Sequence, residues 1–282
     1  MSIGDPIRFA GAWLSLREPA DALARSVRLT EHLARHLANL PDVTVMDLGA
    51  GHGSNLRYLG AHLPDRQHWL LIDHDQELLS RVAHDRLPSQ SVTIETATAD
   101  LDELQWANLD RPDLVTASAL LDLASEVWVK QLARAMVDWQ VPGLFVLNVD
   151  GRRHFIDSKG CIIDNNTDRT MAELFNDHQL RDKGLGRALG PSAARVMSAT
   201  LGKHGFTTEL HHSDWRLEAG DRRWLALGCS WLANWQESAH EQAPEQRAMI
   251  TDWYRQRLKL FTDGKIGMVA GHVDLLALPG GH

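Results

Sequence analysis

Cysteine is nearly absent from this sequence, and long apolar runs are missing altogether. The two cysteines, Cys161 and Cys229, are too few for a disulfide framework or a cysteine-rich zinc site, and they fit a reducing compartment. No stretch of about 18 apolar residues occurs, so we expect no membrane-spanning helix. Charged residues interrupt residues 1–19, so we expect no signal peptide and a cytoplasmic protein.

Positive charge is also in short supply. The chain has 29 Lys and Arg against 37 Asp and Glu, a formal net charge of −8, which disfavours binding to nucleic acid by overall charge. The 44% of hydrophobic and 23% of charged residues are ordinary for a folded protein and exclude a fully disordered chain. A length of 282 residues suits one large domain or two ordinary ones.

Short apolar segments alternate with amphipathic segments through the first half of the chain. Their successive apolar residues are typical of strands that are covered on both faces, and the segments between them have helical periodicity. This alternation predicts parallel strands joined by right-handed crossovers, and therefore an α/β fold with a doubly wound, mostly parallel sheet. The strands are expected at 43–48, 69–72, 91–96, 113–117 and 143–148.

An additional helix is expected before the first strand. Leucine and valine recur near a 3.6-residue period over 19–40. Pro19 suits the start of this helix and Pro41 suits its end. We therefore expect residues 1–40 to form an N-terminal helical cap.

Residues 41–282 are expected to form the main domain, which ends with strands at 206–210 and 269–278. Within it we expect an insertion at 151–204 and a two-helix addition at 221–262. These two additions would cover the substrate site, because ligands of such sheets bind outside the carboxyl ends of the strands. The tryptophans of the two-helix addition recur at helical spacing, which favours a role in the core.

A glycine-rich turn stands between the first expected strand and the following helix, as a nucleotide-binding turn does. Its sequence from 47 to 55 is DLGAGHGSN. A dinucleotide-binding turn has a glycine five residues after the first one, where this chain has Ser54. Asp47 would repel a diphosphate but would suit an ammonium group. The turn therefore favours S-adenosylmethionine, whose nucleoside carries an amino acid and a sulfonium instead of phosphates.

On these residues the chain resembles the class I S-adenosylmethionine-dependent methyltransferases. Further matching pieces are Asp73 at the end of the second strand, Asp100 after the third, and the segment DLVTASAL at 113–120. The resemblance covers about residues 40–150, and the strand at 269–278 corresponds to the antiparallel last strand of the family. It implies a Rossmann-like seven-stranded, mostly parallel sheet, with S-adenosylmethionine as cofactor and S-adenosylhomocysteine as product.

The resemblance also implies which residues hold the nucleoside. Asp73 would accept hydrogen bonds from the ribose hydroxyls, which are charge-assisted and therefore strong. Asp100 would accept from the adenine amino group, and the backbone N–H of Leu101 would lie at the edge of the ring. His74, next to Asp73, would stack on adenine.

The amino-acid end of the cofactor is expected at the glycine turn. Asp47 and the backbone around Gly49 would face it, and Arg17 would reach its carboxylate. The complete predicted set of cofactor-binding residues is Asp47, Gly49, Ala50, Gly51, Asp73, His74, Asp100, Leu101, Ser118, Ala119, Leu120 and Arg17.

The predicted reaction is the transfer of a methyl group to an oxygen or nitrogen of a small-molecule acceptor by in-line displacement. Alignment of the two reactants supplies much of the catalysis, and a general base is needed only where the acceptor must lose a proton. His178, in a long polar connection, is the candidate base. Candidate acceptor-binding residues are Trp13, Asn148, Asp150, Asn176, Gln179 and Lys183.

Two other functions stay open from the sequence: an NAD(P)-dependent oxidoreductase, which Ser54 and Asp47 disfavour, and a non-catalytic S-adenosylmethionine-binding protein. We expect no metal site, since His211 and His212 are neighbours in a strand and point to opposite faces. The expected partner is a small-molecule acceptor, with neither nucleic acid nor membrane. A homodimer formed through the two tryptophan-bearing helices is a further option.

Overall fold

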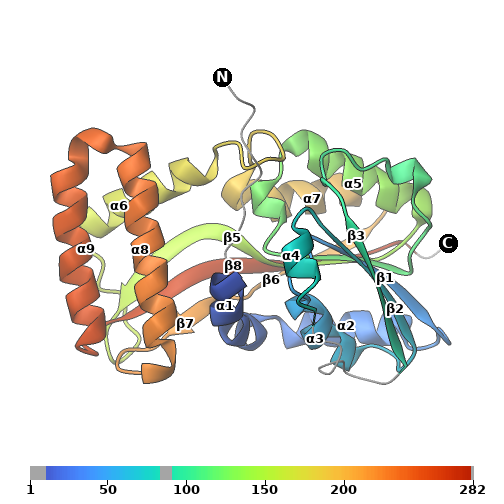
Figure 1. Cartoon of the computed structure of the whole chain (residues 1–282), viewed down its shortest axis with the longest axis horizontal. Coiled ribbons are helices and arrows are strands. Elements are labelled where there is room, and N and C mark those ends of the chain that lie inside the picture. The colour runs from blue at the N-terminus through green and yellow to red at the C-terminus, as the bar shows by residue number, and fades with distance from the viewer. Residues whose placement is uncertain (1–10, 83–90, 281–282) are drawn as a thin grey trace.

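The computed structural model describes residues 11–82 and 91–280, and within them the chain forms one eight-stranded sheet (Figure 1). Seven strands follow the order β3-β2-β1-β4-β5-β8-β6, and β7 pairs with β8. The first five strands are parallel, and β8 is antiparallel to its neighbours. The strands are β1 (Val43–Leu48), β2 (Gln67–Asp73), β3 (Val92–Thr98), β4 (Leu114–Ser118), β5 (Gly143–Ile156), β6 (Thr207–His212), β7 (Trp215–Leu217) and β8 (Gly267–Leu278).

Helices cover both faces of the parallel part, which confirms the predicted doubly wound α/β fold. Alternate residues of β1 enter two different cores: Met46 packs on one face of the sheet and Val45 on the other. The Met46 side is covered by α5 (Glu126–Trp139) and α7 (Ala193–Gly202), and the Val45 side by α2 (Val27–Leu37) and α3 (Ser54–Leu59). The short helix α4 (Gln76–Leu79) follows β2.

Two strands extend well beyond the parallel part of the sheet. β5 has 14 residues and β8 has 12, whereas β4 has 5. The far halves of β5 and β8 carry a separate lobe made by α6 (Asn166–Gln179), α8 (Leu225–Gln242) and α9 (Arg247–Thr262), as Figure 1 shows. We call it the tryptophan lobe.

Aromatic side chains form the core of the tryptophan lobe. Trp235 is 1% exposed and stacks on Phe155 with 5.8 Å between ring centroids, and Trp253 meets both rings edge-on. The expected core role of the C-terminal tryptophans is confirmed.

The predicted end of the fifth strand at residue 148 is wrong, because β5 continues to Ile156. The pairing of β5 with β8 shifts register between Phe145 and Asn148 and again between Val149 and Arg153, and Leu147 has a φ of 57°. These irregularities break the alternation that marks a strand in the sequence.

The helix expected at 19–40 is two helices, α1 (Gly11–Ala24) and α2, and Pro19 lies inside α1 instead of starting it. The chain breaks at Ser26, whose hydroxyl accepts a bond from the backbone N–H of Leu29 and caps α2. The turn of α1 before Pro19 persists because Trp13 and Leu16 pack against the tryptophan lobe. No helix in residues 11–82 or 91–280 is long and apolar enough to cross a membrane.

Candidate active site

The glycine turn after β1 has a backbone that only glycine adopts readily. Gly49, Gly51 and Gly53 have φ of 65°, 54° and 80°. The N–H groups of Gly49 and Ala50 donate to the carbonyl of Ile72, which ties the turn to the end of β2. A Cβ on Gly49 would lie 3.1 Å from a Leu120 methyl carbon, so the turn also packs closely on the loop after β4.

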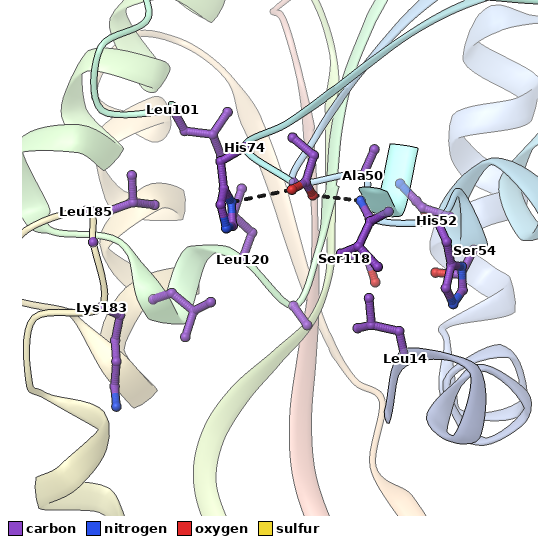
Figure 2. Close-up of a pocket in the computed structure, with 18 of the residues that line it drawn as sticks. Leu14, Ala50, His52, Ser54, His74, Leu101, Ser118, Leu120, Lys183 and Leu185 are labelled. Carbon is purple, nitrogen blue, oxygen red and sulfur yellow. Dashed lines mark hydrogen bonds and ion pairs between the residues drawn. The ribbon is translucent and has the colours of Figure 1, made fainter. Parts of the chain in front are cut away.

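Asp73, the last residue of β2, braces this turn. One oxygen of its carboxylate accepts from the Gly51 N–H at 2.8 Å and the other from the Asp75 N–H at 2.9 Å. The Nδ1 atom of His74 lies 3.4 Å from the carboxylate (Figure 2). Asp73 is 6% exposed and lines a cavity. Its carboxylate therefore supports the turn and also faces a space in which a ligand can bind.

A cavity, here called the turn cavity, opens over the carboxyl ends of β1, β2 and β4 and has about 1100 Å³ of empty space, its open mouth included. Every predicted cofactor-binding residue except Asp47 lines it. Figure 2 shows how side chains from the strand ends, from α1 and from the segment 183–185 surround it. Lys183, predicted for the acceptor, also lines this cavity, and its remaining lining residues were not predicted: Leu14, Asp21, His52, Ser54, Asn55, Leu78, Leu123, Gly184 and Leu185.

Asp47 lies beneath the turn and not on the wall of the turn cavity. It is fully buried, and the Asn55 amide donates to its Oδ1 atom at 2.8 Å, while Oδ2 has no partner. Burial raises the pKa of Asp47 to about 7. The buried guanidinium of Arg25 donates to Asn55 at 2.6 Å and to Ser118 at 3.2 Å, so Asp47 belongs to a network under the cavity.

Arg17 lines the turn cavity as expected, but it is already bound to an acid. Its Nε and Nη2 atoms donate to the two carboxylate oxygens of Asp21 at 2.8 and 3.2 Å. The guanidinium lies 5.1 Å from the ring centroid of Trp215, whose indole N–H also donates to Asp21. These contacts fix Arg17 at the wall between the turn cavity and a second cavity.

This second cavity, here called the aromatic cavity, shares Arg17, Ala119, Leu123 and Lys183 with the turn cavity and lies between the sheet and the tryptophan lobe. Of the predicted acceptor-site residues, Trp13, His178, Gln179 and Lys183 line it. Its other lining residues are Asp122, Leu147, Val149, Arg153, Phe175, Trp215, Trp231, Asn234, Glu237, Ser238, Glu241 and His272.

Three predicted acceptor-binding residues do not reach the aromatic cavity. The Asn148 amide donates to the carbonyls of Phe145 and Val273. Asp150 forms an ion pair with Arg152, and Asn176 bonds the Gly151 carbonyl and the guanidinium of Arg153. The polar groups of these three residues form hydrogen bonds with the backbone in the irregular middle of β5, where the sequence had predicted the strand to end.

His178, the predicted base, has neighbours at both ring nitrogens. Its Nε2 atom lies 3.0 Å from Glu241 and its Nδ1 atom 3.4 Å from the Lys183 ammonium. Burial lowers the pKa of His178, with Glu241 acting in the opposite direction. A role for His178 as a base stays a prediction.

Three buried titratable groups of the aromatic cavity were not predicted from the sequence. Burial raises the pKa of Asp122 to about 6, and it lowers the pKa of Arg153 to about 10 and that of His272 to about 3. Asp122 lies two residues beyond the matched segment 113–120 and was within reach of sequence reasoning. Arg153 and His272 gave no signal, because only the pairing of β5 with β8 brings them together.

Asp150, His212 and Asp214 hold ligand atoms within 4.8 Å of one another, the spacing a metal ion needs. The guanidinium of Arg152 pairs with both carboxylates of this group, at 2.5 and 2.6 Å, and lies 2.8 Å from the His212 ring. The group therefore already surrounds a cation.

Residues 45–143 match a family model described as a methyltransferase domain. No curated protein sequence matches the chain. Among solved structures, the chain is similar to a cyclopropane synthase from Mycobacterium tuberculosis, with 12% identity over 95% of this chain and 94% of that one and a TM-score of 0.49. It is similar to an S-adenosylmethionine-dependent methyltransferase from Geobacter sulfurreducens in complex with S-adenosyl-L-homocysteine, with 15% identity, coverage of 95% and 98%, and a TM-score of 0.45. These two likenesses carry no conclusion about the acceptor.

Proposed function

We propose, from the match of residues 45–143 to a methyltransferase domain, that the chain is an S-adenosylmethionine-dependent methyltransferase and methylates an oxygen or nitrogen of a small molecule held in the aromatic cavity. The observation that carries the proposal is the shared wall of the two cavities. The glycine turn and the strand-end acids line one cavity, and Arg17, Ala119, Leu123 and Lys183 line both. A methyl donor and an acceptor can therefore occupy neighbouring spaces, as a transfer requires.

The residues of the turn cavity fit S-adenosylmethionine. Gly49 and Gly51 leave room where a Cβ would meet Leu120 or Leu14, so a ligand can approach the backbone. Asp73 uses one lone pair of one oxygen for the Gly51 N–H and one of the other for the Asp75 N–H, and keeps others for ribose hydroxyls. Asp100 and the Leu101 backbone would hold the adenine edge. When bound, the cofactor supplies a methyl group that is activated by a positively charged sulfur.

The protein's own contribution is alignment and exclusion of water. Leu120 and Leu123 follow β4 and lie against the turn cavity, where apolar side chains keep water from the reacting groups. Arg17, fixed by Asp21 and Trp215, and Lys183 form the polar part of the shared wall. In-line displacement with a good leaving group needs little beyond this positioning.

Calorimetry with S-adenosylmethionine, S-adenosylhomocysteine and NADH tests the proposal. We expect both sulfur nucleosides to bind and NADH not to bind. Asp73→Ala should weaken binding by about tenfold or more, since charge-assisted hydrogen bonds contribute roughly 1.5–3 kcal/mol. Asp102→Ala, an exposed acid beyond β3, is the control and should bind like the wild type. Binding of NADH without either sulfur nucleoside would contradict the proposal.

A further inference from the structure

A buried carboxyl and a buried guanidinium lie in the aromatic cavity without an ion-pair partner. Asp122 is 5% exposed and Arg153 6% exposed, and both line the cavity. Among the described residues, neither side chain forms an ion pair within 4.0 Å, although the two groups attract each other over a longer distance, as do Arg17 with Asp122 and Asp150 with Arg153. The Oδ1 atom of Asp122 and the Nε atom of Arg153 also lack hydrogen-bond partners. Unpaired buried charges are costly, which points to a ligand that completes them.

The guanidinium of Arg153 lies over an aromatic ring. It lies 3.9 Å from the ring centroid of Phe175, and its Nη1 atom donates to Asn176 at 2.5 Å. A pKa of about 10, lowered by burial, leaves it charged at neutral pH. A stacked guanidinium binds oxygen through the N–H groups in its plane, so Arg153 suits a carboxylate or carbonyl oxygen.

Asp122 lies at the side of the aromatic cavity that meets the turn cavity. It belongs to the loop after β4, and its neighbours Ala119 and Leu123 line both cavities. With a pKa of about 6, which burial raises, Asp122 is mostly ionised at neutral pH and can still take up a proton. The group that contacts Asp122 is therefore the one nearest the methyl donor.

Aromatic rings line the same cavity as these two charged groups. Trp13 and Trp215 lie 6.3 Å apart by ring centroids, and Phe175 and Trp231 also line the cavity. The ring of His272 lies 5.2 Å from that of Trp215, and its Nδ1 atom has no partner. Burial lowers the pKa of His272 to about 3, so the ring is neutral and offers a further hydrogen bond. Such walls suit a flat ring.

We propose, resting on the function proposed above, that the acceptor is a planar ring compound bearing a carboxylate or carbonyl oxygen, which Arg153 binds, and an N–H or O–H group, which Asp122 binds and which is methylated. The lone pair of the acceptor forms the bond to the methyl carbon. The electron pair of the broken carbon–sulfur bond stays on sulfur. The proton of the acceptor passes to the Asp122 carboxylate and then to water.

This assignment places proton transfer on Asp122 instead of His178. Both ring nitrogens of His178 already have neighbours, in Glu241 and Lys183, whereas Asp122 has a free oxygen and lies beside the turn cavity. His178 then orders the outer wall of the aromatic cavity.

Binding of matched ring probes to the protein saturated with S-adenosylhomocysteine tests the proposal. The probes are 2-, 3- and 4-hydroxybenzoate, with benzoate and phenol as the halves, and ligand-observed NMR titration gives the dissociation constants. At least one hydroxybenzoate should bind about tenfold more tightly than benzoate or phenol, because only a hydroxybenzoate can bind Arg153 and Asp122 at the same time. Arg153→Gln should remove the difference in affinity between that hydroxybenzoate and phenol, which lacks the carboxylate. Asp122→Asn should reduce the difference between that hydroxybenzoate and benzoate, which lacks the hydroxyl.

Two variants serve as matched controls. Arg152→Gln changes the adjacent arginine of β5, which pairs with Asp150 and Asp214, and Asp113→Asn changes the carboxyl at the opposite end of β4. Both should bind the probes like the wild type. Circular dichroism checks folding, and if Arg153→Gln does not fold, Arg153→Lys replaces it, since lysine keeps the charge without the planar fork.

The outcomes separate this proposal from the one on which it rests. If S-adenosylhomocysteine binds but no hydroxybenzoate binds more tightly than benzoate and phenol, the acceptor assignment is overturned and the methyltransferase function stands. Equal effects of Arg153→Gln and Arg152→Gln would also overturn the assignment. Failure to bind S-adenosylhomocysteine would remove the proposed function, and the acceptor assignment with it.

Discussion

The turn cavity and the aromatic cavity share a wall but are built in different ways. The turn cavity is made by strand ends and the turns that follow them, so its main residues lie within short segments of the sequence. The aromatic cavity collects side chains from α1, the β4 loop, β5, α6, α8 and β8. The turn cavity is therefore determined mainly by local backbone conformation, whereas the aromatic cavity forms only when elements far apart in the sequence pack together.

This difference indicates that the two cavities can change independently. In the function proposed above, the glycine turn and the acids at the strand ends would hold the nucleoside, whereas the tryptophan lobe could present other side chains to other acceptors without altering the turn. Substitutions in each region test that independence.

Removal of the central tryptophan of the lobe should have the largest effect. Trp235 is 1% exposed, stacks on Phe155 and donates its indole N–H to the Met171 carbonyl at 2.8 Å. Trp235→Ala should lower the free energy of unfolding by about 3–5 kcal/mol, as large-to-small core changes do, measured by denaturant titration. Trp106→Ala, at a half-buried site in the sheet region, should cost less. Where Trp235→Ala is folded, S-adenosylhomocysteine affinity should be retained. A loss of S-adenosylhomocysteine binding free energy as large as the loss of unfolding free energy would show that the lobe and the turn cavity form one unit.

The buried acid beneath the turn should make stability depend on pH. Burial raises the pKa of Asp47 from 3.8 to about 7, with Asn55 and Arg25 lowering it and Asp73 raising it. Between these values the folded state holds the proton and the unfolded chain does not, so the Asp47 contribution to the unfolding free energy falls as pH rises, by up to about 1.4 kcal/mol per pH unit.

Asp47→Asn removes this titration and keeps an oxygen that can accept from Asn55. Denaturant titrations from pH 4 to pH 7 should therefore show the variant gaining stability relative to the wild type as pH rises. Two parallel stability curves would contradict the assignment of a neutral, protonated Asp47 below pH 7.

A methyl group in the glycine turn should affect ligand binding more than folding. Gly49 has φ +65°, and an added Cβ would lie 3.1 Å from Leu120. Because Gly49 and Leu120 both line the turn cavity, a shift of either to make room predicts that Gly49→Ala weakens S-adenosylhomocysteine binding about tenfold by calorimetry. Gly205→Ala is the matched control, since Gly205 has φ +87° and nothing within 4 Å. Both should lose some stability, but if both also lost affinity, the turn would have no specific role.

The histidine at the outer wall should have the smallest effect. His178 and Glu241 form a partly exposed pair, and such pairs contribute about 1 kcal/mol or less. His178→Ala should keep the affinity for S-adenosylhomocysteine. It should weaken binding of the tightest hydroxybenzoate less than Asp122→Asn does, and Glu241→Ala, which removes the other member of the pair, should have a similar effect. A loss equal to that of Asp122→Asn would return His178 to the centre of the acceptor site.

The sequence predicted more of the turn cavity than of the aromatic cavity. Gly49, Asp73 and Asp100 were identifiable because a strand, a turn and an acid at the next strand end are adjacent in the chain or regularly spaced. The sheet and both late helices were predictable for the same reason. The predicted sheet lacked β7, whose three residues, Trp215–Leu217, are too few for a pattern.

The lining of the aromatic cavity, the proposed acceptor site, was only partly predictable, because it depends on strand pairing between residues far apart in the sequence. A change of register within β5 turns Arg153 into the aromatic cavity and leaves Asn148 and Asp150 to satisfy the strand itself. Nothing in the order of these residues shows where the shift occurs. His272 becomes part of the site only because β8 lies antiparallel to β5.

A crystal structure of the protein with S-adenosylhomocysteine tests the central claim most directly. We predict density for the nucleoside in the turn cavity, with the ribose hydroxyls within hydrogen-bond distance of the Asp73 carboxylate and the sulfur facing the wall shared with the aromatic cavity. Nucleoside density outside the turn cavity, or a ribose that does not contact Asp73, would contradict the account.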